Sequence, residues 1–263
     1  MKNLNLLQPF HLVTVSPWPI LLSLSLLNLL VDIVNWFISG NLILLIFKFV
    51  VVILCMYQWW RDVVRESLYQ GFHTFMVMNG IKLGMILFIV SEVMFFVSIF
   101  WCYFHMFLSP SVEIGNIWPP FNIEMFNPYS IPLLNTVILL SSGVSITWSH
   151  YSMLMENKSE SEKALLCTIF LGAIFSILQL YEYMMAEFTF SDSVYGSSFF
   201  MSTGFHGLHV LIGTMFLIVN YMRMKGFNYS MLHHLGFELA AWYWHFVDVV
   251  WLFLYLLVYF WSY

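Results

Sequence analysis

A single carboxylic acid interrupts one of the longest apolar segments of the sequence. Glu92 lies near the middle of the run LFIVSEVMFF at positions 87–96, where its neighbours are almost all apolar. A charged side chain at the centre of a bilayer costs about 2.5 kcal/mol or more on insertion scales, so an acid there needs a role. Two interpretations remain open: a protonated Glu92 that hydrogen-bonds to another helix, and a group that handles protons.

Two histidines spaced three apart are the next candidates. His206 and His209 share one face of a helix, and a pair of this kind in a membrane helix suggests haem or copper. A redox metal site also needs further ligands and an open coordination position. Four further histidines are candidate ligands but follow no recognisable ligand pattern: His105, His245 and the loop pair His233 and His234. We therefore predict no metal site, and expect these side chains to hydrogen-bond within the bundle or to a lipid phosphate.

The last apolar segment carries four polar or amphipathic side chains close to one helical stripe. They are Glu238, Trp242, His245 and Asp248. Such a stripe faces protein or water instead of lipid. It either lines a proton path or ties the helix to its neighbours, and we favour the second interpretation. With His206, the residues Glu238, His245 and Asp248 form the predicted intramembrane polar network.

Arginines next to aromatic residues mark the ends of two apolar segments. Arg61 and Arg65 follow Trp60, and Arg223 ends a later segment. The planar guanidinium suits phosphate oxygens, so anionic phospholipid is a plausible ligand; the alternative is ordinary charge that sets membrane orientation. The sequence has no nucleophile elbow, phosphate-binding glycine loop or paired catalytic carboxylates, so we predict no catalytic residue on this chain.

The composition requires a membrane to position these residues. The 263-residue chain is 61% hydrophobic and only 9% charged, whereas soluble domains carry about 25% charged residues. The apolar runs are long and do not alternate with polar residues, which favours helices over barrel strands. Its net charge of −5 without a basic block argues against nucleic-acid binding. Three isolated cysteines indicate neither disulfides nor a thiolate site.

Seven transmembrane helices in a single membrane domain follow from the apolar runs. Their approximate ranges are 17–37, 42–60, 81–107, 131–154, 164–185, 199–221 and 235–260. With this count, eight of the nine Lys and Arg residues, Lys2 included, fall on the side of the N-terminus, and none falls in the opposite loops. By the positive-inside rule the N-terminus therefore lies on the positively charged side.

Long polar-containing strings in fixed order resemble one known family over essentially the whole chain. They include YQWWRDV at 57–63, SEV at 91–93, WPP at 118–120, TGFHGLHV at 203–210 and AAWYWHFVDVVW at 240–251. These strings are similar to those of subunit III of mitochondrial cytochrome c oxidase. The sequence departs from the family pattern at Phe72, where many relatives have a histidine, and at Lys48, which lies inside the second predicted span.

The resemblance implies an all-α polytopic membrane fold with two bundles, spans one and two against spans three to seven, around a lipid-filled V-shaped cleft. It also implies a non-catalytic core subunit of the respiratory terminal oxidase, which stabilises the catalytic subunit, supports proton uptake and holds phospholipids. Cytochrome c oxidation, oxygen reduction and proton pumping would belong to partners, namely catalytic subunit I and copper-bearing subunit II, which hold haem a, haem a3 and copper. Small accessory subunits and other respiratory complexes are further expected partners.

Site residues are carried over from the resemblance position by position. Glu92 matches a buried carboxyl that faces the cleft, and Trp60, Arg65, His209 and Arg223 match positions that hold lipid headgroups. No cofactor is implied on this chain itself. The positive side would be the mitochondrial matrix, so the C-terminus would lie in the intermembrane space of the inner membrane.

Other classes of membrane protein fit less well. A seven-helix receptor usually has disulfide-bonded outer loops and larger soluble loops, and a stand-alone proton-translocating transporter is expected to show inverted repeats or broken helices. The nearest alternative is a membrane redox subunit that binds its own metal. Metal analysis of the isolated chain would distinguish it from a subunit without a cofactor.

Overall fold

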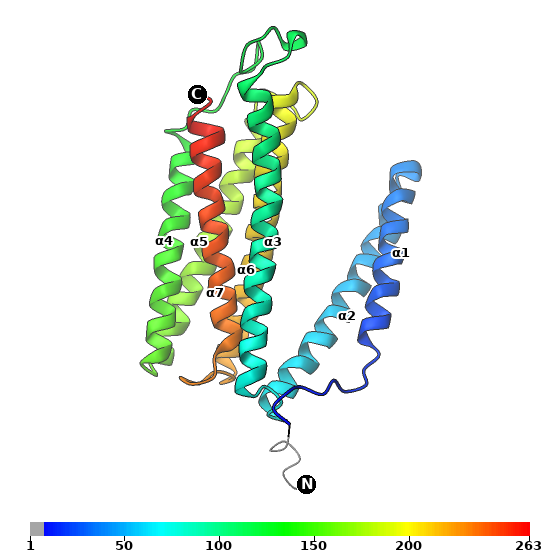
Figure 1. Cartoon of the computed structure of the whole chain (residues 1–263), viewed down its shortest axis with the longest axis vertical. Coiled ribbons are helices and arrows are strands. Elements are labelled where there is room, and N and C mark those ends of the chain that lie inside the picture. The colour runs from blue at the N-terminus through cyan, green and yellow to red at the C-terminus, as the bar shows by residue number, and fades with distance from the viewer. Residues whose placement is uncertain (1–7) are drawn as a thin grey trace. The chain divides into compact units, whose positions relative to one another are not determined.

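Long helices make up most of the described chain. The computed structural model describes residues 8–263, and no strand occurs among them (Figure 1). The helices are α1 (Trp18–Ser39), α2 (Leu42–Leu68), α3 (Phe75–Leu108), α4 (Ile131–Leu154), α5 (Lys158–Met184), α6 (Val194–Lys225) and α7 (Leu235–Leu254), with the short η2 (Val112–Ile114) and the terminal π-helical turn η3 (Tyr255–Phe260).

Seven of these helical segments, with α7 continued through η3, are long and apolar enough to cross a membrane. The predicted all-α fold with seven spans is therefore confirmed. The lipid-filled cleft and the membrane orientation stay predictions, and Lys2, one of the cations used for the orientation, lies outside the described residues.

Several helices extend well beyond the apolar runs that predicted them. The predicted second span ends at position 60, but α2 continues to Leu68 through Arg61 and Arg65. Similarly, α6 runs from Val194 to Lys225 instead of 199–221. An apolar run marks only the hydrocarbon depth of about 30 Å, whereas a helix continues through the headgroup layers, where polar side chains are solvated.

Side-chain caps fix where three of the helices begin. Asn41 accepts a hydrogen bond from the backbone N–H of Ile43 at 3.1 Å, and Ser193 accepts one from Gly196 at 3.2 Å. Asn157 caps α5 in the same way. Each cap satisfies an N–H group that has no partner within its own helix, which defines the first turn.

The described chain divides into two compact units, with the boundary after Lys82 inside α3. In the first unit α1 and α2 run side by side (Figure 1). The indole N–H of Trp18 donates to Asp62 at 2.6 Å and joins the start of α1 to the last part of α2. Ser25 and Val52 are the only buried residues of these two helices, and the others are exposed or partly exposed, which suits a lipid surrounding.

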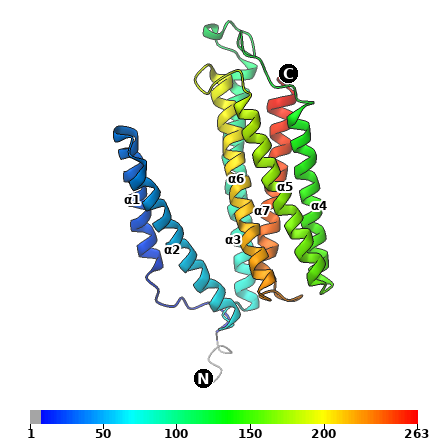
Figure 2. The same ribbon diagram turned by 180° about the vertical axis from the view of Figure 1, so that it is seen from behind.

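The second unit, residues 83–263, is built around α7. Figure 2 shows α4, α5 and α6 next to one another, with α7 behind them. Trp244 and Trp251 of α7 are completely buried. Their indole N–H groups donate across to α4, to Ser142 at 2.8 Å and to Thr136 at 3.2 Å. Polar bonds of this kind fix the rotation of α7, which apolar packing in lipid specifies weakly.

Candidate functional site

The carboxyl of Glu92 meets the imidazole of His209 across the α3–α6 interface. Oε2 of Glu92 and Nε2 of His209 are 2.9 Å apart, and the two side chains are 24% and 11% exposed within this chain. The sequence indicated both residues, but as members of two different kinds of site. The structure brings them together as one pair.

The second nitrogen of His209 determines what the pair can do with protons. Nδ1 lies 2.6 Å from the carbonyl oxygen of Phe205. A carbonyl only accepts, so Nδ1 carries a proton and donates it. Nε2 then either accepts from a protonated Glu92 or, in the imidazolium form, donates to the carboxylate. In both states one proton lies between the two residues and their summed charge is zero.

Aromatic rings surround this proton-sharing pair. The ring of Phe96 is centred 5.1 Å from that of His209, and Tyr243 and Phe246 lie at 6.4 and 6.2 Å. Such surroundings contain little water, so the electrostatic part of the hydrogen bond is strong and an unpaired partner would be costly. The local environment therefore favours keeping the pair together.

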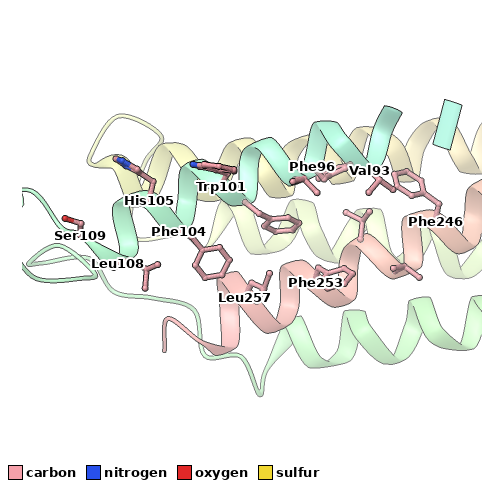
Figure 3. A pocket seen from close by; sticks show the side chains of 14 residues that line it. Val93, Phe96, Trp101, Phe104, His105, Leu108, Ser109, Phe246, Phe253 and Leu257 are labelled. Atoms are coloured by element: carbon pink, nitrogen blue, oxygen red, sulfur yellow. The ribbon is translucent and has the colours of Figure 1, made fainter. Parts of the chain in front are cut away.

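An apolar groove starts beside the pair and follows α3 toward its C-terminal end. Its volume is about 810 Å³, and Val93 and Phe96 lie at its beginning. Figure 3 shows Trp101 and Phe104 of α3 opposite Phe253 and Leu257 from the α7 side; the polar lining residues His105 and Ser109 lie at the far end of α3. The groove offers carbon surface to a hydrocarbon chain or an apolar helix.

His206 has a different environment from His209, although both lie on α6. It is completely buried, its Nε2–H donates to the carbonyl of Val247 at 3.2 Å, and its ring packs against Phe175 and Trp251. It joins α6 to α7. In residues 8–263, no group of three or more His, Cys, Asp or Glu side chains is placed to hold a metal ion.

The four residues of the predicted polar network lie in three separate places. Nδ1 of His245 is 3.9 Å from Oδ2 of Asp248, and this carboxyl packs on α4, where a Cβ added to Gly143 would come within 2.9 Å of it. Glu238 lies in the first turn of α7. His206 bonds to the backbone carbonyl of Val247, further along α7. The structure brings together only His245 and Asp248.

The predicted headgroup residues are divided between the two units. Trp60 and Arg65 belong to the first unit, where Trp60 is 62% exposed and Nη1 of Arg65 is 3.8 Å from Asp62. In the second unit, the guanidinium of Arg223 lies 4.6 Å from the ring centre of Tyr229. A Cβ at Gly236 would lie 2.5 Å from Nη1 of Arg223, so α7 leaves room for this arginine.

The sequence reasoning missed a buried polar cluster between α5 and the end of the chain. Glu182 is completely buried, and Gln179 and Tyr259 are 5% and 2% exposed. The Tyr259 hydroxyl lies near Glu182 and Gln179, yet the side-chain polar atoms of all three lack a well-formed hydrogen bond. The available signal was the spacing of Gln179 and Glu182, three residues apart on one helix face.

Comparison with known proteins shows the family to which the chain belongs. The family model described as cytochrome c oxidase subunit III matches residues 8–263. The chain belongs to the cytochrome c oxidase subunit III family. It is 55% identical to the cytochrome c oxidase subunit 3 proteins of Anopheles quadrimaculatus and Drosophila melanogaster, in each case over 97% of this chain and 97% of the relative. The corresponding protein of Paracentrotus lividus is 56% identical over the same shares.

Membership in the subunit III family confirms the role predicted from the sequence. The chain is a non-catalytic core subunit of cytochrome c oxidase, and the family itself has no catalytic centre. The Glu92–His209 pair is therefore a site within a subunit whose family has no catalytic centre.

Proposed function

We propose that this chain preserves turnover of the oxidase by stabilising the catalytic subunit, supporting proton uptake and holding structural phospholipids. The Glu92–His209 pair is the observation that carries the proposal. It holds one proton between two groups that can exchange charge without changing their sum. A pair of this kind can move its shared proton between the carboxyl and the imidazole without a change in summed charge, and loss of that proton leaves one negative charge on the pair.

The lipid part of the proposal rests on two features. Trp60, Arg65 and Arg223 present an aromatic face and guanidinium groups of the kind that bind headgroup phosphate, and His209 is the fourth headgroup residue carried over from the family. The groove along α3 supplies apolar surface for acyl chains. The lipid-filled cleft implied by the resemblance remains part of this proposal.

The proposed partners follow from the family. They are catalytic subunit I and subunit II, which would hold haem a, haem a3 and copper, together with small accessory subunits and other respiratory complexes. The proposed location is the mitochondrial inner membrane with the N-terminus in the matrix. Eight of the nine Lys and Arg residues on the side of the N-terminus support this orientation.

The decisive experiment is oxygen consumption by the purified oxidase over many turnovers, before and after detergent removal of this chain. We expect the depleted enzyme to start with normal activity and to lose it faster, while it keeps its haem and copper. Loss of metal together with the chain, or an unchanged rate of inactivation, would overturn the proposal. Restoring the purified chain with phospholipid controls for damage by the detergent.

A further inference from the structure

Two histidines that do not belong to the proton-sharing pair face each other where α4 ends and α7 begins. His150 lies near the C-terminal end of α4, four residues before Leu154, and His234 immediately precedes α7. Their Nε2 atoms are 3.3 Å apart. We propose that His150 and His234 bind a divalent transition-metal ion of the Zn²⁺ or Cu²⁺ class, with solvent completing its coordination.

The distance between the two nitrogens suits a common metal ion. Zn²⁺ binds histidine nitrogen at about 2.0–2.1 Å in tetrahedral geometry, which places two such nitrogens roughly 3.3–3.4 Å apart. The measured 3.3 Å separation therefore matches two ligands of one ion. The ring planes are inclined by 59° with centres 5.3 Å apart, so the rings are not stacked face to face.

His234 is already held in the tautomer that a metal ligand needs. Its Nδ1 lies 3.2 Å from the carbonyl oxygen of Ser230. Because that oxygen only accepts, Nδ1 carries the proton and Nε2 directs a lone pair toward His150. Metal-binding histidines almost always donate their other N–H to a carbonyl, carboxylate or water, which fixes the ring and raises its basicity.

A carboxylate provides negative charge close to the two histidines. Glu238 follows His234 by four residues, one helical turn along α7, and interacts electrostatically with His150. In residues 8–263 no three such side chains are within ligand distance of one point, so the site has two protein ligands and Glu238 compensates charge. Both histidines are only partly buried, which leaves space for water ligands.

Without metal, the same geometry is a hydrogen bond in which Nε2–H of His150 donates to Nε2 of His234. Metal binding replaces this proton, which moves to Nδ1 of His150 or to solvent, and no electron is transferred. The bound ion would join the end of α4 to the start of α7. It would therefore stabilise the folded second unit by a free energy that grows with the logarithm of the metal concentration once this exceeds Kd.

Equilibrium dialysis of Zn²⁺ with the full chain in detergent micelles tests the proposal. We expect one Zn²⁺ ion whose Kd rises at least tenfold in His150→Gln and in His234→Gln. His233→Gln is the matched control, because the backbone N–H of this adjacent histidine bonds to Ser230 and does not depend on the imidazole, and the variant should keep the ion. Equal affinity and stoichiometry in all four proteins would overturn the proposal.

A spectroscopic measurement on the unmodified chain keeps the test independent of whether the variants fold. One equivalent of Cu²⁺ should give an electron paramagnetic resonance spectrum with coupling to two imidazole nitrogens. Zn²⁺ should also raise the unfolding temperature of the chain and of His233→Gln. A Cu²⁺ spectrum with fewer than two nitrogen ligands would show that the histidines form only a hydrogen bond.

Discussion

Glu92 and His209 are 117 residues apart in the chain, yet one hydrogen bond of 2.9 Å joins them across α3 and α6. The other imidazole nitrogen, Nδ1, donates its proton in a hydrogen bond to the carbonyl of Phe205. The shared proton is therefore the one that the pair can exchange while the bond to Phe205 remains. This relationship separates a structural from a proton-handling role, because the two roles respond differently to a change of the carboxyl.

The first prediction concerns two substitutions of the same acid. Glu92→Leu leaves Nε2 of His209 without a partner and should lower the free energy of unfolding by about 1–3 kcal/mol. Glu92→Gln keeps a donor for that nitrogen and should lower it by less than about 1 kcal/mol, but its amide cannot give up a proton. We expect slower proton uptake by oxidase that contains Glu92→Gln, measured with a pH indicator during turnover.

Ser91→Ala is the control for this prediction, because the Ser91 hydroxyl donates to the carbonyl of Phe88 within its own helix at 2.6 Å. It should change neither stability nor proton uptake measurably. Proton uptake that is equally fast in wild-type and Glu92→Gln oxidase would leave the pair with a purely structural role.

The pairing of Glu92 with His209 also shows where sequence reasoning stops. The apolar runs predicted all seven spans, because hydrocarbon depth directly constrains the length of a run. They could not predict which face of α3 meets α6, because α3 is apolar around its whole circumference. Spacing placed His206 and His209 on one face, but it could not show that one bonds to Val247 and the other to Glu92.

The second prediction concerns space between α5 and α7. A Cβ on Gly172 would lie 2.7 Å from the ring of Trp244 and 2.7 Å from the methyl group of Thr214. Gly172→Ala should therefore force these side chains apart and lower the free energy of unfolding by about 1–3 kcal/mol. Thermal unfolding in detergent measures the change. Gly207→Ala in α6, where nothing lies within 4 Å of the added atom, should not destabilise, and equal effects would refute the packing argument.

The third prediction concerns pH and two acids outside the spans. The hydrogen bond that protonated Glu187 donates to Glu124, followed by the negative charge of Glu124, raises the pKa of Glu187 above its usual value. The folded chain therefore binds this proton more tightly than the unfolded chain, and stability falls as pH rises from the usual glutamate pKa through the raised one. Glu124→Gln should remove that loss. Unfolding temperatures measured across this pH range, with Glu113→Gln as control, should show a flatter profile only for Glu124→Gln.

The fourth prediction concerns Asp192, whose pKa is lowered where that of Glu187 is raised, so stability changes with pH in the opposite direction. The backbone N–H of Thr189 donates to Asp192 at 2.7 Å, which, with the Thr189 hydroxyl, lowers the pKa of this carboxyl. Its contribution to stability is complete above the usual aspartate pKa and disappears as pH falls through the lowered one. Asp192→Asn should therefore reduce stability at neutral pH and should approach wild type at acid pH. A constant difference between the two proteins over the whole range would show that the loop bond does not depend on charge.

The last prediction concerns Glu182, which is completely buried and whose carboxyl oxygens have no well-formed hydrogen bond. A buried polar group of this kind costs free energy, and an apolar side chain of similar size often makes a protein equally stable or more stable. Glu182→Leu should therefore leave the unfolding free energy unchanged or raise it by about 1 kcal/mol, and Gln179→Leu is the matched variant on the same helix face. If Glu182→Leu instead destabilises the chain by about 3 kcal/mol or more, the carboxyl satisfies Tyr259 through bound water. In that case the cost is that of a broken buried network.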